Sequence, residues 1–151
     1  MTDVLVSAEI AADPKVVYDL VSDVTRMGEW SLETTSCRWV DGGGPAIGAR
    51  FRGTNKRHLA RWTTTCTVTA ADPGRRFAFD VTWGPWAISE WSYDIKPIDG
   101  AACRVTEGWS DKRVTALRVA SPLVMGIVDR AAHNRTSMQA TLAALKAAAE
   151  A

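Results

Sequence analysis

The stretch that decides the fold reads DPKVVYDLVSDVTRMGEWS and covers residues 13–31. Asp13 can cap a helix and Pro14 suits its first turn, so the spacing predicts a helix that begins here. The apolar side chains of this helix share one face: Val17, Leu20 and Val21. Ser22 and Asp23 end it and can cap a second short helix that runs through Met27. The stretch therefore predicts two short helices in succession.

The segments on either side of these helices have the pattern of strands. Residues 3–10 alternate apolar and polar side chains, which is the period of a half-buried strand. Residues 34–109 contain six further short strands separated by turns, the later ones at 49–55, 61–70, 75–83, 87–95 and 102–109. Regular spacing with short turns predicts an antiparallel meander.

The last part of the chain predicts one long helix that opens at Pro122 and runs to about residue 149. At 100° per residue one stripe contains Val124, Ile127, Ala131, Asn134, Met138, Leu142 and Leu145. The predicted fold class is α+β, with a curved seven-stranded antiparallel sheet around the long helix and two short helices between the first two strands. The 151 residues predict a single domain, 1–151.

The order of elements, together with residues 14–31, resembles the polyketide cyclase/dehydrase and START-related lipid-binding superfamily (SRPBCC), which has the helix-grip fold. Shorter resemblances are Trp91-Ser92-Tyr93 with Pro97, Gly108-Trp109, and the residues Asn134, Met138, Leu142 and Leu145. Leu32 departs from the pattern, because many relatives carry proline there. The resemblance implies a cavity for an apolar ligand between sheet and helix, and no cofactor. It does not imply one chemistry, since the superfamily includes aromatases, cyclases, hydrolases and lipid carriers.

Strand parity assigns the side chains that face the concave side of the sheet. A four-residue loop at 71–74 would pair Val68 with Phe77, Cys66 with Phe79 and Trp62 with Trp83. A three-residue loop at 98–100 would pair Tyr93 with Val105 and Trp91 with Glu107. Both hairpins give the same assignment of faces, and a one-residue slip would have reversed a whole strand.

The inward positions supply the candidate ligand-binding residues. They are Trp30, Phe51, Trp62, Cys66, Phe79, Trp83, Trp91, Tyr93, Val105, Glu107, Trp109, Ile127, Asn134 and Met138. Pockets for small molecules are mostly apolar and aromatic with a few placed polar groups. The alternative for each aromatic residue is plain core packing.

The few polar candidates have two interpretations each. The Asn134 amide binds either a ligand oxygen or side chains of the sheet. Glu107 is either a general acid or base or one half of an ion pair, with Arg130 as a candidate partner. The Tyr93 hydroxyl either donates to a ligand or only packs in the core. We expect His133 to be solvated, and Cys37, Cys66 and Cys103 to be reduced thiols that point inward.

Composition excludes several classes of function. The net charge of +1 argues against nucleic acid as a partner. Three cysteines without metal spacing and two histidines predict no metal site. No apolar run reaches the length of a membrane span, which argues against stable membrane insertion, and no signal peptide is recognisable, so we expect a cytoplasmic protein. Self-association to an oligomer stays open.

Three functions follow in order of preference. The first is binding of a small hydrophobic ligand, which is a lipid, an aromatic compound or a polyketide-like molecule. The second is a polyketide cyclase, aromatase or dehydratase with Glu107 and Tyr93 as candidate catalytic residues, although the inward positions hold no histidine. The third is a co-chaperone-like interaction module, which predicts an exposed apolar patch.

Overall fold

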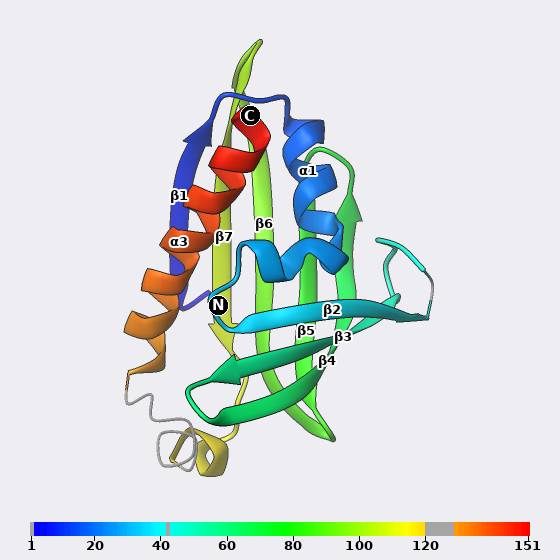
Figure 1. The fold of residues 1–151 in the computed structure, drawn as a ribbon, viewed down its shortest axis with the longest axis vertical. Helices are drawn as coiled ribbons and strands as arrows, with labels where there is room; N and C mark the ends of the chain where they lie inside the picture. Colours follow the sequence, from blue (N-terminus) through cyan, green and yellow to red (C-terminus); the bar gives the residue numbers. More distant parts are fainter. Residues whose placement is uncertain (1, 42, 120–128) are drawn as a thin grey trace.

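The computed structural model describes residues 2–41, 43–119 and 129–151. In these residues seven antiparallel strands form one curved sheet in the order β1-β7-β6-β5-β4-β3-β2, and the C-terminal helix α3 packs beside β1 and β7 (Figure 1). The elements are β1 (Val4–Ile10), α1 (Pro14–Ser22), the 3-10 helix η1 (Val24–Glu29), β2 (Thr34–Asp41), β3 (Arg50–Arg57), β4 (Ala60–Asp72), β5 (Arg76–Trp83), β6 (Trp86–Asp99), β7 (Ala102–Asp111) and α3 (Arg130–Glu150). The predicted α+β helix-grip fold is confirmed.

The segment between β1 and β2 folds as its caps predict. The Asp13 carboxylate accepts a hydrogen bond of 2.8 Å from the backbone N–H of Lys15, and Asp23 accepts one of 3.3 Å from that of Thr25. Gly28 then allows the close approach of η1 to β2, because a Cβ atom at this position would collide with the carbonyl oxygen of Thr35. Both short helices are therefore held against the sheet.

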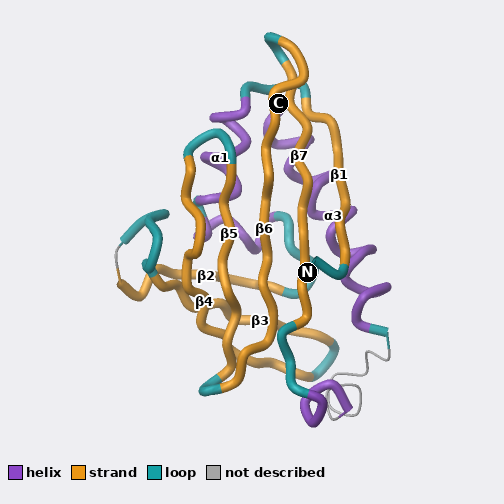
Figure 2. Tube along the Cα trace, turned by 180° about the vertical axis from the view of Figure 1, so that it is seen from behind, coloured by secondary structure: helices purple, strands orange, loops and turns teal. Residues whose placement is uncertain are grey.

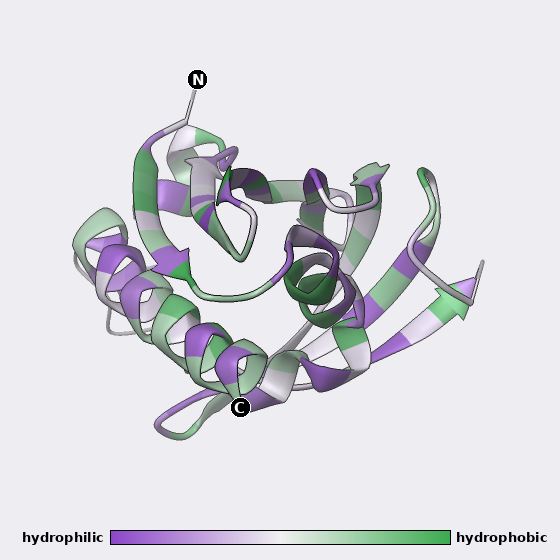
Figure 3. Ribbon diagram, turned by 90° about the horizontal axis from the view of Figure 1, so that it is seen from above, coloured by the Kyte–Doolittle hydropathy of each residue, from purple (hydrophilic) through white to green (hydrophobic). Residues whose placement is uncertain are grey.

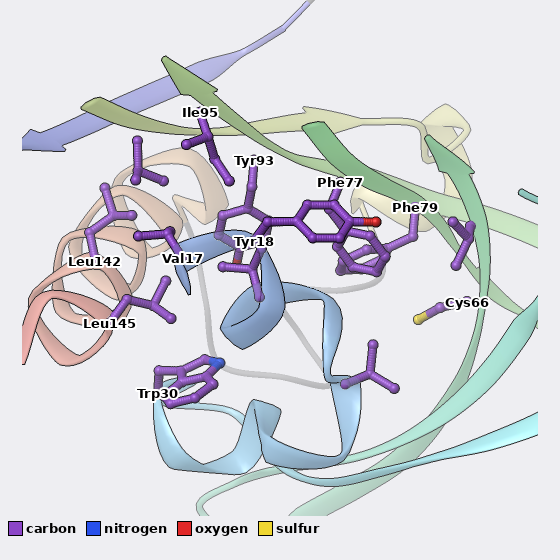
Figure 4. Close-up of a cluster of buried hydrophobic side chains, with 14 of the residues drawn as sticks. Val17, Tyr18, Trp30, Cys66, Phe77, Phe79, Tyr93, Ile95, Leu142 and Leu145 are labelled. Atoms are coloured by element: carbon purple, nitrogen blue, oxygen red, sulfur yellow. The ribbon is translucent and has the colours of Figure 1, made fainter. Parts of the chain in front are cut away.

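The core lies between the concave face of the sheet and the helices. Figure 4 shows side chains of the sheet, among them Phe77 and Phe79, directed toward Tyr18 of α1 and the leucines of α3. Tyr18 and Phe77 meet edge to face, with ring centroids 6.4 Å apart. Seen from behind, α1 and α3 lie behind the strands, with α3 at the β1 edge, and seen from above the sheet curves around them (Figures 2 and 3).

Both predicted hairpin registers are wrong by two residues on the facing strand. Val68 pairs with Phe79 rather than Phe77, and Tyr93 pairs with Glu107 rather than Val105. Likewise Cys66 pairs with Val81 and Trp91 with Trp109, while Trp62 pairs with Asn55 of β3 and Trp83 with Trp86 of β6.

The cause is that the strands continue into the predicted loops. β4 extends to Asp72, whose carbonyl accepts a 2.9 Å hydrogen bond from Arg75 in a tight turn, and β6 extends to Asp99. A bulge interrupts each pairing near its turn. Because the error is an even number of residues, the predicted faces of these strands still hold.

Helix α3 begins later than predicted. Asp129 has an extended backbone and its carboxylate accepts a 3.0 Å hydrogen bond from the N–H of Ala132, so Asp129 is the N-cap and the helix starts at Arg130. The predicted stripe residues Val124 and Ile127 lie outside the described residues. No helix within the described parts of the chain has the length and apolar character needed to cross a bilayer.

The set of α3 residues predicted to face the sheet is also incomplete. Ala131 is exposed, whereas Arg130 and His133 are partly buried. From Asn134 the buried row continues to Arg130, four residues back, and not to Ala131, three residues back. His133 lies beside this row, so its predicted exposure to solvent is wrong.

Candidate functional site

A cavity of about 420 Å³ lies between the concave face of the sheet and α3. Strands β2 to β7 and the segments that follow them supply its walls, and α3 closes one side. Eleven of the predicted site residues line it: Trp30, Phe51, Trp62, Cys66, Phe79, Trp83, Trp91, Tyr93, Glu107, Trp109 and Asn134. The volume falls in the range of roughly 300–1,000 Å³ that small-molecule sites occupy.

Two predicted residues do not line the cavity, and a third was not among the described residues. Val105 is fully buried in the core one cross-strand row behind Glu107. Met138 packs with Val4 and Trp109 in a separate cluster. Ile127 lies outside the described residues.

The floor of the cavity is the cross-strand pair Tyr93 and Glu107. The next row along the sheet, which contains Ile95 and Val105, is solid core. The Tyr93 hydroxyl donates a 3.0 Å hydrogen bond to Oε2 of Glu107. The other carboxyl oxygen, Oε1, is buried and has no hydrogen-bond partner among the described residues.

Glu107 has an unusual protonation state because of this environment. Burial raises the pKa of its carboxyl to about 8, and the hydrogen bond from Tyr93 offsets only part of the rise. Burial, and then the neighbouring carboxyl, raise the pKa of Tyr93 well above its usual value. At neutral pH the floor therefore presents a carboxylic acid and a phenol, both uncharged.

The predicted ion pair of Glu107 with Arg130 is wrong. Arg130 lies at the start of α3, and its guanidinium is 3.1 Å from the carboxylate of Glu33. No charged side chain in the described residues pairs with Glu107. The parity that placed Glu107 inward gave no information on how deep it lies, and Arg130 sits at the opposite end of the cavity.

Aromatic rings form most of the walls above the floor. Trp91 and Trp109 pair across β6 and β7 with ring centroids 6.5 Å apart, and Phe79 meets Phe51 at 5.1 Å. Cys37 and Cys66 complete the apolar lining. Burial raises the pKa of both thiols, that of Cys37 to about 12, so they are protonated and unreactive at neutral pH.

Polar side chains in the walls differ in the number of hydrogen bonds that they make with the protein. Asn55 donates a 3.2 Å hydrogen bond to Thr64 and accepts one of 2.9 Å from Thr34. The Thr141 hydroxyl of α3 donates to the carbonyl of Trp30 at 3.0 Å. In contrast, Asn134 is 3% exposed, and its amide makes no hydrogen bond with the described residues. The sheet therefore does not supply the partners that one interpretation of Asn134 required.

The mouth of the cavity is charged. Arg61, Arg113 and Arg130 line its outer part together with Glu33. Arg113 is held by Asp111 at 2.7 Å, and the Nε2 atom of His133 lies 3.6 Å from the Glu33 carboxylate. Burial, aided by the charge of Arg130, lowers the pKa of His133.

Several lining residues escaped the sequence prediction. Ser89 lies two positions before Trp91 on the same strand, so parity alone would have found it. Ser137 lies three positions after Asn134 on α3 and would have followed from a wider helix face. Glu33 and Arg113 lie at strand ends, where no periodicity applies.

The whole chain matches a family model. The description of that model is polyketide cyclase/dehydrase and lipid transport, and it matches residues 1–150. No protein in the curated set matches the chain.

Several solved structures are also similar to this chain. A polyketide cyclase-like protein from Corynebacterium glutamicum is 30% identical, with a TM-score of 0.60, and the match covers 97% of this chain and 88% of that one. The major latex-like protein 151 of Panax ginseng is 11% identical with a TM-score of 0.72, over 97% and 95% of the two chains. The di-domain ARO/CYC protein BexL, from the BE-7585A biosynthetic pathway, is 22% identical with a TM-score of 0.68, over 97% and 46%. This chain thus spans about half the length of BexL, and the last two likenesses concern the fold alone.

Proposed function

The chain belongs to the polyketide cyclase/dehydrase and lipid transport family, and from this premise we propose that it binds a small hydrophobic molecule in the cavity between the sheet and α3. The lining favours aromatic or polyketide-like compounds, because five tryptophans surround the space: Trp30, Trp62, Trp83, Trp91 and Trp109. The observation that carries the proposal is the cavity of about 420 Å³ itself, since side chains that only formed a core would fill it.

The expected affinity follows from the apolar area that a ligand would bury. About 300 Å² of apolar ligand surface gives roughly 7 kcal/mol of favourable transfer free energy. Lost translational freedom and ordering reduce this value. Dissociation constants in the micromolar range are therefore expected without any ion pair.

Tryptophan fluorescence during titration with fatty acids, sterols, flavonoids and aromatic polyketides tests the proposal. A saturable change with one chemical class is expected, because the tryptophans line the cavity. Ser137→Phe, which fills the cavity from α3, should abolish the response. Ala131→Phe is the matched control, since Ala131 is exposed on the same helix. No saturable response to any compound by the folded protein, or an equal response in both variants, would contradict ligand binding in this cavity.

A second candidate function is acid-assisted cyclisation or dehydration of such a ligand. One observation favours it, because Glu107 is a buried acid whose pKa is raised to about 8 and which lines the cavity. A protonated carboxyl of this kind can donate to a ligand carbonyl as negative charge develops on its oxygen. Glu107→Gln should then keep ligand binding and lose turnover, whereas a pure binding protein would show no turnover in either form.

A further inference from the structure

Two buried polar side chains from different elements line the cavity without a full set of partners. Glu107 on β7 is 2% exposed and one of its carboxyl oxygens has no partner among the described residues. Asn134 on α3 is 3% exposed, and its amide has no hydrogen bond within the described chain. A buried polar group without a partner costs roughly 1–3 kcal/mol. A ligand that supplies a partner to the Glu107 oxygen would therefore stabilise it, and the Asn134 amide lines the same cavity.

Charged side chains, unlike these two uncharged polar groups, lie at the mouth of the cavity. The arginines near the cavity lie at its mouth, and Arg113 and Arg130 are each bound to a carboxylate of the protein. On the sheet, Glu107 is paired with Tyr93 of β6 and Val6 of β1, and α3 contributes Asn134 to the same cavity. In the described residues the interior thus offers uncharged hydrogen-bonding groups and no cation. A ligand carboxylate at the floor would meet no positive charge and would lose its hydration.

We infer that the ligand is an uncharged ring compound that carries a carbonyl group, and that the Glu107 carboxyl at the floor and the Asn134 amide in the wall donate hydrogen bonds to its oxygens. This inference rests on the proposed function. The final torsion of a glutamate side chain is soft, so a small rotation turns the partnerless oxygen toward a bound molecule. Tyr93 holds the other oxygen and fixes the position of the carboxyl.

Three probes with one tricyclic skeleton test the inference: fluorene, 9-fluorenone and fluorene-9-carboxylate. Titration calorimetry at pH 6.5 should give 9-fluorenone a roughly 3- to 10-fold higher affinity than fluorene, the range expected for one net hydrogen bond. The carboxylate should bind more weakly than either. At pH 9.5 the preference for 9-fluorenone should fall, because ionised Glu107 no longer donates a proton and only the Asn134 amide still does.

Variants connect the preference to the two residues. Glu107→Leu should reduce the preference for 9-fluorenone and keep fluorene binding, while Glu107→Gln should keep the preference at both pH values. Asn134→Leu should weaken 9-fluorenone binding. Gln139→Leu, which also replaces an amide side chain by leucine but at an exposed position of α3, should not. Fluorene serves as an internal measure of an intact cavity in every variant.

The outcomes separate the two proposals. Equal affinity for fluorene and 9-fluorenone, or a preference that Glu107→Leu leaves unchanged, overturns the inference and leaves the binding cavity in place. Tight binding of the carboxylate also overturns it. Failure of all three probes to bind to the folded protein would overturn the proposed function and the inference with it.

Discussion

The floor of the cavity contains a buried carboxyl group and the mouth a partly buried one, and the pKa values of the two shift in opposite directions. At the floor, Glu107 has only the Tyr93 hydroxyl as a partner, and burial raises the pKa of its carboxyl to about 8. At the mouth, burial also acts on Asp111, but the hydrogen bonds and charge of Arg113, together with the charge of Arg118, bring the pKa of its carboxyl below the usual value.

Burial alone therefore does not determine the charge of an acidic side chain in this protein. A guanidinium within hydrogen-bond distance decides it. The protein therefore separates an uncharged, apolar interior from a charged entrance, although the acids at both ends are shielded from water. A ligand that enters passes ion pairs and comes to rest among aromatic rings and neutral donors.

The largest expected effect concerns the floor and the pH dependence of stability. The folded protein binds the Glu107 proton more tightly than the unfolded chain, so this residue makes the free energy of unfolding fall as pH rises from about 4.5 to about 8. Glu107→Gln removes this pH-dependent loss of stability, because glutamine keeps the shape of the protonated acid and cannot ionise. The variant should be more stable than the wild type by about 3 kcal/mol at pH 7, with the difference shrinking toward pH 5.

Urea unfolding of both proteins at several pH values measures this difference. The difference should grow by about 1.4 kcal/mol for each pH unit between pH 5 and pH 8. A constant difference across this interval would mean that Glu107 is ionised in the folded protein and that floor and mouth are alike.

The next effect concerns the mouth. Arg113→Ala leaves Asp111 without its main partner, and both side chains of this pair are almost covered, at 11% and 13% exposed. The variant should lose about 2 kcal/mol of stability at pH 7, since it leaves a partly buried carboxylate with only the more distant Arg118, 3.6 Å away, as a partner. Lys15→Ala breaks an exposed pair with Asp19 and should change stability little. Equal losses in the two variants, measured by urea unfolding, would show that the pair at the mouth behaves as an ordinary surface contact.

The smallest effect also lies at the mouth and concerns His133. The charge of Arg130 contributes to the lowered pKa of this histidine, while Glu33 opposes it. Arg130→Met should therefore raise the pKa of His133, which NMR titration of the imidazole can follow. A fall in that pKa after the substitution would contradict the arrangement of these three side chains.

Much of the fold could be predicted because its patterns are local. Residues 13–31 contain both caps and the glycine that their packing needs, and strand parity is a property of each strand alone. Pairing depends on where a turn closes, and the extension of β4 to Asp72 and of β6 to Asp99 shifted both registers by an even step. The late start of α3 had a local signal, Asp129, but the continuous apolar stripe concealed it.

The site was less predictable because its chemistry depends on depth. Strand parity placed Glu107 inward and the helical stripe placed Asn134 inward. Only the three-dimensional arrangement shows that no described arginine pairs with Glu107 and that Arg130 pairs with Glu33. Ser89 and Ser137 escaped the prediction, although strand parity and a wider helix face would have found them. Glu33 and Arg113 come together from strand ends that are distant in the sequence, which a single sequence does not reveal. The ligand-binding roles of the residues around the cavity stay predictions.

The most direct test of the account is the titration of the Glu107 side chain itself. Carbon NMR of protein labelled with ¹³C at the glutamate carboxyl, with Glu107→Gln to assign the signal, reports the protonation of this one group. The Glu107 carboxyl should be protonated at pH 7 and should titrate near pH 8. A Glu107 signal that titrates near pH 4.5, as an exposed glutamate does, would contradict the neutral floor and the ligand class inferred from it.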